Sequence, residues 1–107
     1  MTPDECRTRE DIRREIDAIN DQLVDLLAAR FAYVRRMAEI KSDPGEARVV
    51  SRIDAVLARV AERAGERGLA PDLAADLWTR MIEWNIAWEE HAITERKAVK
   101  VDKEASR

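Results

Sequence analysis

Residues 9–41 read REDIRREIDAINDQLVDLLAARFAYVRRMAEIK, and no other stretch constrains the architecture as strongly. Its apolar side chains recur at steps of three or four residues, which places them along one face of a helix. The members of this face are Ile12, Ile16, Ile19, Leu23, Leu27, Val34 and Met37. The same spacing places two cations, Arg30 and Lys41, on this face. The stretch therefore predicts a long amphipathic helix that carries positive charge among its apolar side chains.

The two cations indicate a binding site. A buried cation is costly unless an anion lies against it, and no Asp or Glu shares the face with Arg30 and Lys41. Each cation also has an ordinary explanation. Arg30 could extend to solvent or pair with a carboxylate of another helix, and Lys41 could interact with the negative end of its own helix. Because both point the same way, about three turns apart, we expect a site for a small acid.

Two further helices are predicted after this stretch. Residues 42–45 (SDPG) are a strong turn signal. The second helix is predicted from about Arg48 to Arg67, and Gly65 and Gly68 mark its end. The third begins at Pro71, a favoured first helical residue, and ends at about Arg96. Residues 97–107 are a polar tail that we expect to fray.

The length of the first helix predicts a second copy of the chain. The helix runs from about Arg9 to Lys41, and Thr8 or Asp11 could cap its start. It is roughly 50 Å long at 1.5 Å per residue, whereas twice the expected radius of gyration of such a domain is roughly 26 Å. The other two helices can cover only part of its apolar face. We therefore expect an all-α, three-helix chain that forms an intertwined homodimer; a monomeric three-helix bundle is the alternative.

The composition fits a single helical domain over residues 1–107, with an ordered core at about 8–96. Charged residues make up 38% of the chain and aromatic residues 5%. A net charge of -3 argues against non-specific binding of nucleic acid. One cysteine and one histidine exclude a Cys/His zinc site, and we expect neither a metal nor a cofactor. With no signal peptide and no apolar run that could span a membrane, a cytoplasmic protein is expected.

Further polar residues are candidates for the same site. Glu89 lies on the apolar face of the third helix, where it could pair with a cation or face the same cavity, and Asn85 lies one turn before it. Arg52 begins the second helix beside Ile53, a place where most arginines are simply solvated. Arg13 lies about 100° off the face of its own helix, so only a partner chain could readily bring it to this pocket.

The residue types of the predicted site limit the reactions that it could catalyse. The chain shows no pair of nucleophile and base, no set of metal ligands and no phosphate-binding loop. Several cations around one pocket suit a small dianion. Such a site can hold a flexible substrate in a reactive shape and stabilise the charge that develops in the transition state. A unimolecular rearrangement needs no other catalytic group.

Several segments of the chain resemble the all-α chorismate mutase family. The segments are IRREIDAIND (12–21), LLAARFAYV (26–34), IK (40–41), SR (51–52) and WNIAWEE (84–90). The spacing of Arg13, Arg30, Lys41 and Arg52 is similar to that of the family, and the resemblance covers roughly residues 4 to 95. The opening TPDEC (2–6) and the short loop also resemble the isochorismate-pyruvate lyase branch.

The resemblance implies a homodimer with two active sites and a Claisen rearrangement of chorismate to prephenate. Arg30 would bind one substrate carboxylate, and Arg13 of the partner chain would bind a carboxylate as well. Lys41 would donate a hydrogen bond to the ether oxygen as its bond to carbon breaks. Arg52 would support the carboxylate side of the pocket, and Glu89 completes the predicted catalytic set. The predicted substrate-binding residues are Asn85, Ile53, Ile82 and Met37.

Two positions depart from the family pattern. Ile53 stands where mutases usually carry a Glu that contacts the substrate hydroxyl, and the lyases tend to be apolar there. Glu89 stands where many bacterial members have Gln. A carboxylate cannot donate to the ether oxygen and repels a dianion, whereas a protonated carboxyl can donate. We therefore expect Glu89 to work in its protonated form.

Three other functions stay open. The first is isochorismate-pyruvate lyase, which forms salicylate and pyruvate on the same scaffold and which Ile53 favours. The second belongs to another class, a non-catalytic helical dimer that binds a small acid or a protein partner. The third is a mutase for an amino-substituted chorismate, which Glu89 would suit.

Overall fold

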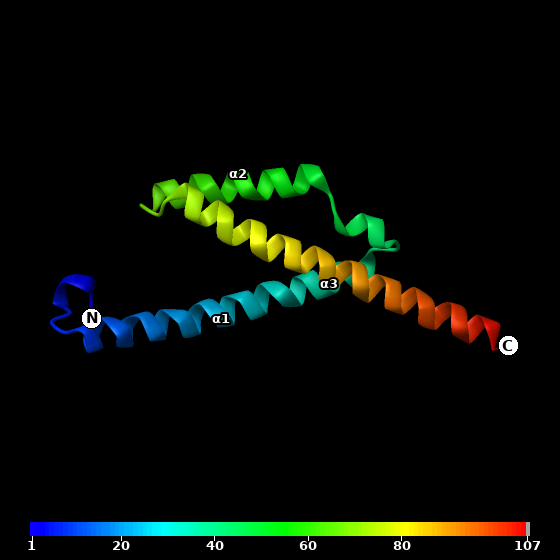
Figure 1. Cartoon of the computed structure of the whole chain (residues 1–107), viewed down its shortest axis with the longest axis horizontal. Helices are drawn as coiled ribbons and strands as arrows, with labels where there is room; N and C mark the ends of the chain where they lie inside the picture. The colour runs from blue at the N-terminus through cyan, green and yellow to red at the C-terminus, as the bar shows by residue number, and fades with distance from the viewer. Residues whose placement is uncertain (107) are drawn as a thin grey trace. The chain divides into compact units, whose positions relative to one another are not determined.

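The structure is a computed structural model, and it describes residues 1–106. All regular structure in this range is helical, which confirms the all-α prediction (Figure 1). The elements are η1 (Pro3–Glu5), α1 (Arg9–Ile40), η2 (Pro44–Ala47), α2 (Val50–Glu66) and α3 (Pro71–Ala105). No helix within residues 1–106 is both long and apolar enough to cross a membrane. The chain divides into two compact units, Met1–Tyr33 and Val34–Arg107.

In the first unit, α1 begins at the predicted residue because Thr8 and Asp11 cap it reciprocally. The backbone N–H of Asp11 donates to Thr8 Oγ1 at 3.1 Å, and the backbone N–H of Thr8 donates to Asp11 Oδ2 at 3.2 Å. These bonds satisfy donors that the first turn of a helix leaves without an intrahelical partner. The pKa of Asp11 is lowered, chiefly by a hydrogen bond from the backbone of Arg7.

The apolar face of α1 in this unit is not buried within the chain. Five aliphatic side chains on it keep between 48% and 54% of their surface exposed: Ile12, Ile16, Ile19, Leu23 and Leu27. Large exposed apolar surfaces of this kind are typical of sites where another molecule binds.

The second unit has a small core between α2 and the first half of α3, which lie side by side (Figure 1). Gly68, with φ 74°, ends α2, and the N–H of Leu69 donates to the carbonyl of Ala64 at 2.8 Å. This arrangement is a common helix end at which glycine avoids steric strain. The core residues are Ala47, Ile82 and Ile86, with Ile53, Val56, Leu57 and Trp78 packed against them. Ala47 belongs to η2, so the core also fixes the segment that follows α1.

Two helix boundaries differ from the prediction. The third helix continues to Ala105 and does not end near Arg96. Residues 97–105 contain no Gly or Pro and several good helix formers, so a polar sequence there is compatible with helix. The second helix begins at Val50 and not at Arg48, because Arg48 and Val49 are extended after the turn of η2.

Replacing Ile93 with Ala is expected to lower the free energy of unfolding by about 2 to 5 kcal/mol. Ile93 on α3 is 0% exposed, so truncation removes buried apolar contact and leaves a cavity. Urea denaturation followed by circular dichroism measures the change. Val99→Ala on the same helix is the control, because Val99 is 51% exposed. Equal midpoints for the two variants would contradict the packing of Ile93.

Candidate active site

The second unit contains a largely buried ion pair between Lys41 and Glu89. Lys41 Nζ lies 3.2 Å from Glu89 Oε2, and the two side chains are only 17% and 7% exposed. Lys41 follows the last residue of α1, and its N–H still donates to the carbonyl of Met37 at 3.0 Å. Glu89 comes from the middle of α3 and is buried. The sequence predicted both residues as polar groups on apolar faces, and the structure brings them together.

Pairing with a cation is the ordinary alternative that the sequence left open for Glu89, and it supplies the anion that a buried Lys41 requires. Removing two charges from water costs free energy that their attraction only partly repays, and apolar packing in their place often stabilises a protein as well or better. The ammonium of Lys41 has three N–H donors, and the recorded bond to Glu89 uses one of them. The site can therefore offer donors to an oxygen of a ligand without first breaking the ion pair.

The other predicted residues of this unit lie on the same elements. Asn85 is half-buried on α3, one turn before Glu89, so both belong to one face of the helix. Ile82 is buried, and Ile53 on α2 packs against the core that contains it. Met37 on α1 is 48% exposed. Arg52 is exposed near the start of α2.

Two predicted cations, Arg30 and Arg13, belong to the first unit. Arg30 is half-buried on α1. Arg13 is exposed on the same helix, with its Nη1 3.4 Å from Oε1 of Glu10. Among the predicted catalytic residues, Lys41 and Glu89 are therefore the pair in direct contact in the structure. The roles of Arg13, Arg30 and Arg52 stay predictions.

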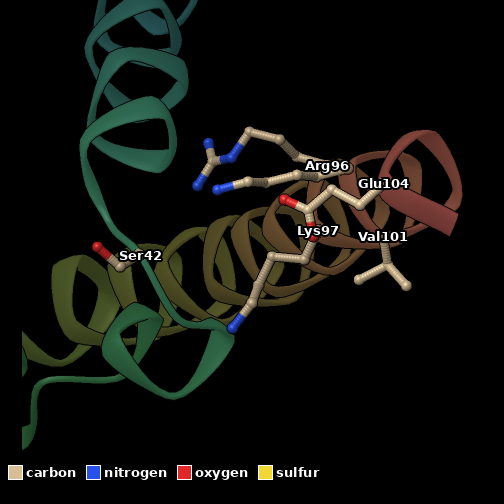
Figure 2. Close-up of a pocket in the computed structure, with 6 residues that line it drawn as sticks. Ser42, Arg96, Lys97, Val101 and Glu104 are labelled. Carbon is tan, nitrogen blue, oxygen red and sulfur yellow. The ribbon is translucent and has the colours of Figure 1, made fainter. Parts of the chain in front are cut away.

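Sequence reasoning missed two residues that hold the segment after α1. Arg96 Nη1 donates to the carbonyl of Ala38 at 2.7 Å, and its Nη2 donates to the carbonyl of Lys41 at 2.5 Å. Lys97 Nζ donates to Asp43 Oδ1 at 2.6 Å. Figure 2 shows both side chains leaving α3 toward the chain that follows α1. In the sequence neither residue differs from an ordinary solvated cation, so no sequence signal identified them.

A hollow of about 580 Å³ lies beside these contacts, between the end of α1 and the last turns of α3 (Figure 2). Its lining residues are Ser42, Arg96, Lys97, Lys100, Val101 and Glu104. Lys41 and Glu89 do not line it, so it is not the pocket that the sequence predicted. It adjoins the segment that carries Lys41, whose next residue, Ser42, donates its N–H to Glu46 Oε2 at 3.1 Å.

A second charged contact fixes the chain just before α2. Arg48 Nη1 and Nη2 donate to the two carboxylate oxygens of Glu83 on α3, at 2.9 and 2.5 Å. These hydrogen bonds lower the pKa of Glu83 and raise that of Arg48. Because the folded pKa of Glu83 is depressed, the contact contributes stability above the usual range of a Glu, and this contribution is lost as pH falls through the folded value. Both side chains are about half exposed, so the contribution is small.

Comparison with known proteins gives two matches. Residues 12–90 match the family described as chorismate mutase type II. The chain is also 33% identical over 86 residues to the isochorismate pyruvate lyase of Pseudomonas aeruginosa, a match that covers 80% of this chain and 85% of that protein. The family match includes Lys41 and Glu89 and ends before Arg96.

Proposed function

Because the chain belongs to the chorismate mutase type II family, as the sequence resemblance predicted, we propose that it converts chorismate to prephenate. The observation that carries this proposal is the buried pair of Lys41 and Glu89, within the residues that match the family. The reaction is a rearrangement within one molecule, in which one carbon–oxygen bond breaks and one carbon–carbon bond forms. It needs a dianion held in a reactive shape and a donor at the ether oxygen.

The proposed roles follow from this chemistry. Lys41 donates to the ether oxygen, on which negative charge develops in the transition state. Arg30 binds one substrate carboxylate, and Arg13 of a partner chain binds a carboxylate from the other side. Arg52 supports the carboxylate side of the pocket, and Asn85 supplies a neutral polar contact. The proposed apolar contacts to the substrate are Ile53, Ile82 and Met37.

The proposed assembly is a homodimer, which supplies Arg13. The half-exposed apolar face of α1 supports a homodimer, because a second copy of the chain would bury its five aliphatic side chains, namely Ile12, Ile16, Ile19, Leu23 and Leu27. Closed dimers are the commonest form of soluble oligomer and bring the same residues of both chains to one interface. Analytical ultracentrifugation measures the assembly directly, and a monomer at micromolar concentration would contradict it.

Isochorismate-pyruvate lyase is the second candidate. The similarity to a protein with this name favours it, and so does Ile53, which has no carboxylate for the substrate hydroxyl. The same cations serve both reactions, because chorismate and isochorismate each carry two carboxylates and an ether bond that breaks. A helical dimer that binds a small acid without turnover is the candidate from another class.

A product assay separates these functions. Purified protein receives chorismate or isochorismate in separate reactions, and prephenate, salicylate and pyruvate are quantified. Prephenate from chorismate, with little salicylate from isochorismate, supports the mutase. Salicylate and pyruvate as the dominant products assign the chain to the lyase branch. Binding of either acid without turnover supports the non-catalytic dimer.

That Glu89 acts in its protonated form stays a prediction from the sequence. In the structure Glu89 accepts a hydrogen bond from Lys41. We expect Glu89→Gln to retain measurable turnover of chorismate, because the amide oxygen can still accept from the ammonium of Lys41. Initial rates on chorismate measure the effect, and Glu90→Gln, at the exposed neighbouring residue, is the control. Complete loss of turnover in Glu89→Gln, with Glu90→Gln unchanged, would contradict this expectation.

A further inference from the structure

Both the side chain and the backbone of Lys41 are held by α3. Its ammonium contacts Glu89, and its backbone carbonyl accepts a hydrogen bond from Arg96. Glu89 and Arg96 lie on α3 about 10 Å apart along the helix axis, which is about two turns. Between them, Ile93 is fully buried. The position of Lys41 is therefore set by a rigid segment of α3 and not only by the end of α1.

The end of α1 depends on Arg96 because it has no cap of its own. The last carbonyls of a helix have no intrahelical partner, and most helices satisfy them with a glycine in the left-handed region or with a nearby basic residue. The last turn of α1 contains no basic residue, and no residue from 1 to 106 other than Gly68 has a positive φ. Arg96 reaches across from α3 and donates to the carbonyl of Ala38, in the last turn of α1, and to that of Lys41, the residue after the helix.

A second contact holds the residues that follow. Lys97, next to Arg96, donates to Asp43 two residues after Lys41. Ala38, whose carbonyl Arg96 binds, is itself buried at 2% exposure. Arg96 holds the backbone before and at Lys41, the exposed Lys97–Asp43 pair adds a weaker contact after it, and Glu89 holds the tip of the Lys41 side chain.

We propose that Arg96 is a positioning residue, which sets the place of the Lys41 ammonium by capping the end of α1 from α3. The proposal rests on the proposed function, in which Lys41 acts at the ether oxygen. Without Arg96, the carbonyls of Ala38 and Lys41 turn to water, and the backbone of Lys41 is free to shift. A shift of about 1 Å in a group that acts on the reacting atoms can lower a rate by about 100-fold.

This role predicts a specific kinetic signature. Lys41 stabilises charge that appears only in the transition state, so its displacement lowers kcat and leaves KM nearly unchanged. General destabilisation of the fold would instead reduce the amount of active protein at higher temperature. The fork of an arginine can donate to two carbonyls at once, which the ammonium of a lysine at the same position cannot reproduce in the same geometry.

The test uses Arg96→Ala and Arg96→Lys in the full chain, on whichever substrate the wild-type protein turns over. We expect Arg96→Ala to lower kcat by about 10- to 100-fold with KM within about twofold. Arg96→Lys should lie between Arg96→Ala and the wild type, and added guanidinium chloride at non-denaturing concentration should partly restore kcat of Arg96→Ala. Arg63→Ala is the matched control, because Arg63 pairs locally with Glu66 on α2 and should not respond to guanidinium.

Retention of wild-type kcat by both Arg96 variants would overturn the proposal, and so would a rise in KM without a fall in kcat. If the wild-type protein turns over neither substrate, the proposed function fails, and hydrogen exchange then decides the positioning role alone. The amides between Ser42 and Ala47 should exchange faster in Arg96→Ala than in the wild type or Arg63→Ala. Unchanged exchange there would overturn the proposal independently of any activity.

Discussion

Replacing Lys41 with Met is expected to lower kcat by about 100- to 1000-fold, because it removes the proposed donor to the ether oxygen. Met keeps much of the length and apolar volume of the lysine stem, so the variant removes charge with little change in packing. KM should change much less, since the carboxylates of the substrate are bound by arginines in the proposed site. Steady-state rates on chorismate measure both constants.

The loss of charge at Lys41 also leaves Glu89 buried without its cation. Removing one partner of a buried ion pair can cost up to about 3 to 5 kcal/mol, and the 17% exposure of Lys41 places this case below the upper end. The double variant Lys41→Met/Glu89→Gln removes both charges and should recover most of the stability without recovering kcat. Recovery of kcat in the double variant would show that the first loss came from the fold.

A second lysine separates this effect from a general loss of positive charge. Lys103→Met, at an exposed residue in the last turn of α3, should keep kcat within about twofold of the wild type. An equal loss in Lys103→Met and Lys41→Met would contradict the catalytic role of Lys41, because Lys103 makes no recorded contact with the site.

The parts of the fold that the sequence predicted depend on local rules. The start of α1 was predicted because Thr8 and Asp11 form their hydrogen bonds within a single turn. The pairing of Lys41 with Glu89 could be anticipated because each is a charged residue on an apolar helix face, where a partner is required. Periodicity alone therefore located the two residues that carry the proposed site.

The parts that the sequence did not predict depend on contacts between distant segments. Residues 97–107 were predicted as a fraying tail because they are polar, yet Lys97 binds Asp43, and Arg96 just before the tail binds the carbonyls of Ala38 and Lys41. The late start of α2 follows from η2 and from the contact of Arg48 with Glu83. Helix propensity and periodicity contain no information on such pairings, because in the sequence Arg48, Arg96 and Lys97 do not differ from ordinary solvated cations.

In the proposed site, we expect the choice between chorismate and isochorismate to depend on Ile53. An apolar side chain there offers no hydrogen bond to a hydroxyl, so it does not select the position of that hydroxyl on the ring. Ile53→Glu provides a carboxylate at this residue and should raise the preference for chorismate if the pocket includes it. The chain belongs to the chorismate mutase type II family and is similar to a protein named as an isochorismate pyruvate lyase, so the family alone does not specify the product.

A mixture of two inactive variants, Arg13→Ala and Arg30→Ala, is expected to recover about a quarter of the wild-type kcat after joint refolding. In the proposed dimer each site combines Arg30 of one chain with Arg13 of the other. Half of the dimers in an equal mixture contain one chain of each kind, and each of these has one intact site and one site that lacks both arginines. The exposed position of Arg13, off the apolar face of α1 and close to Glu10, fits a side chain that is used by a partner chain.

The control for this mixture is Arg30→Ala with Arg52→Ala. In the proposed site these two arginines come from the same chain, so every mixed dimer has one arginine missing from each site and no activity returns. Differently tagged chains, purified by both tags in sequence, establish that mixed dimers are present. Mixed dimers of Arg13→Ala and Arg30→Ala without activity would contradict a shared site, because Arg13 would then act on its own chain or not at all. Recovery only in the mixture that contains Arg13→Ala would support a site that is complete only when the partner chain contributes Arg13, as the proposed homodimer requires.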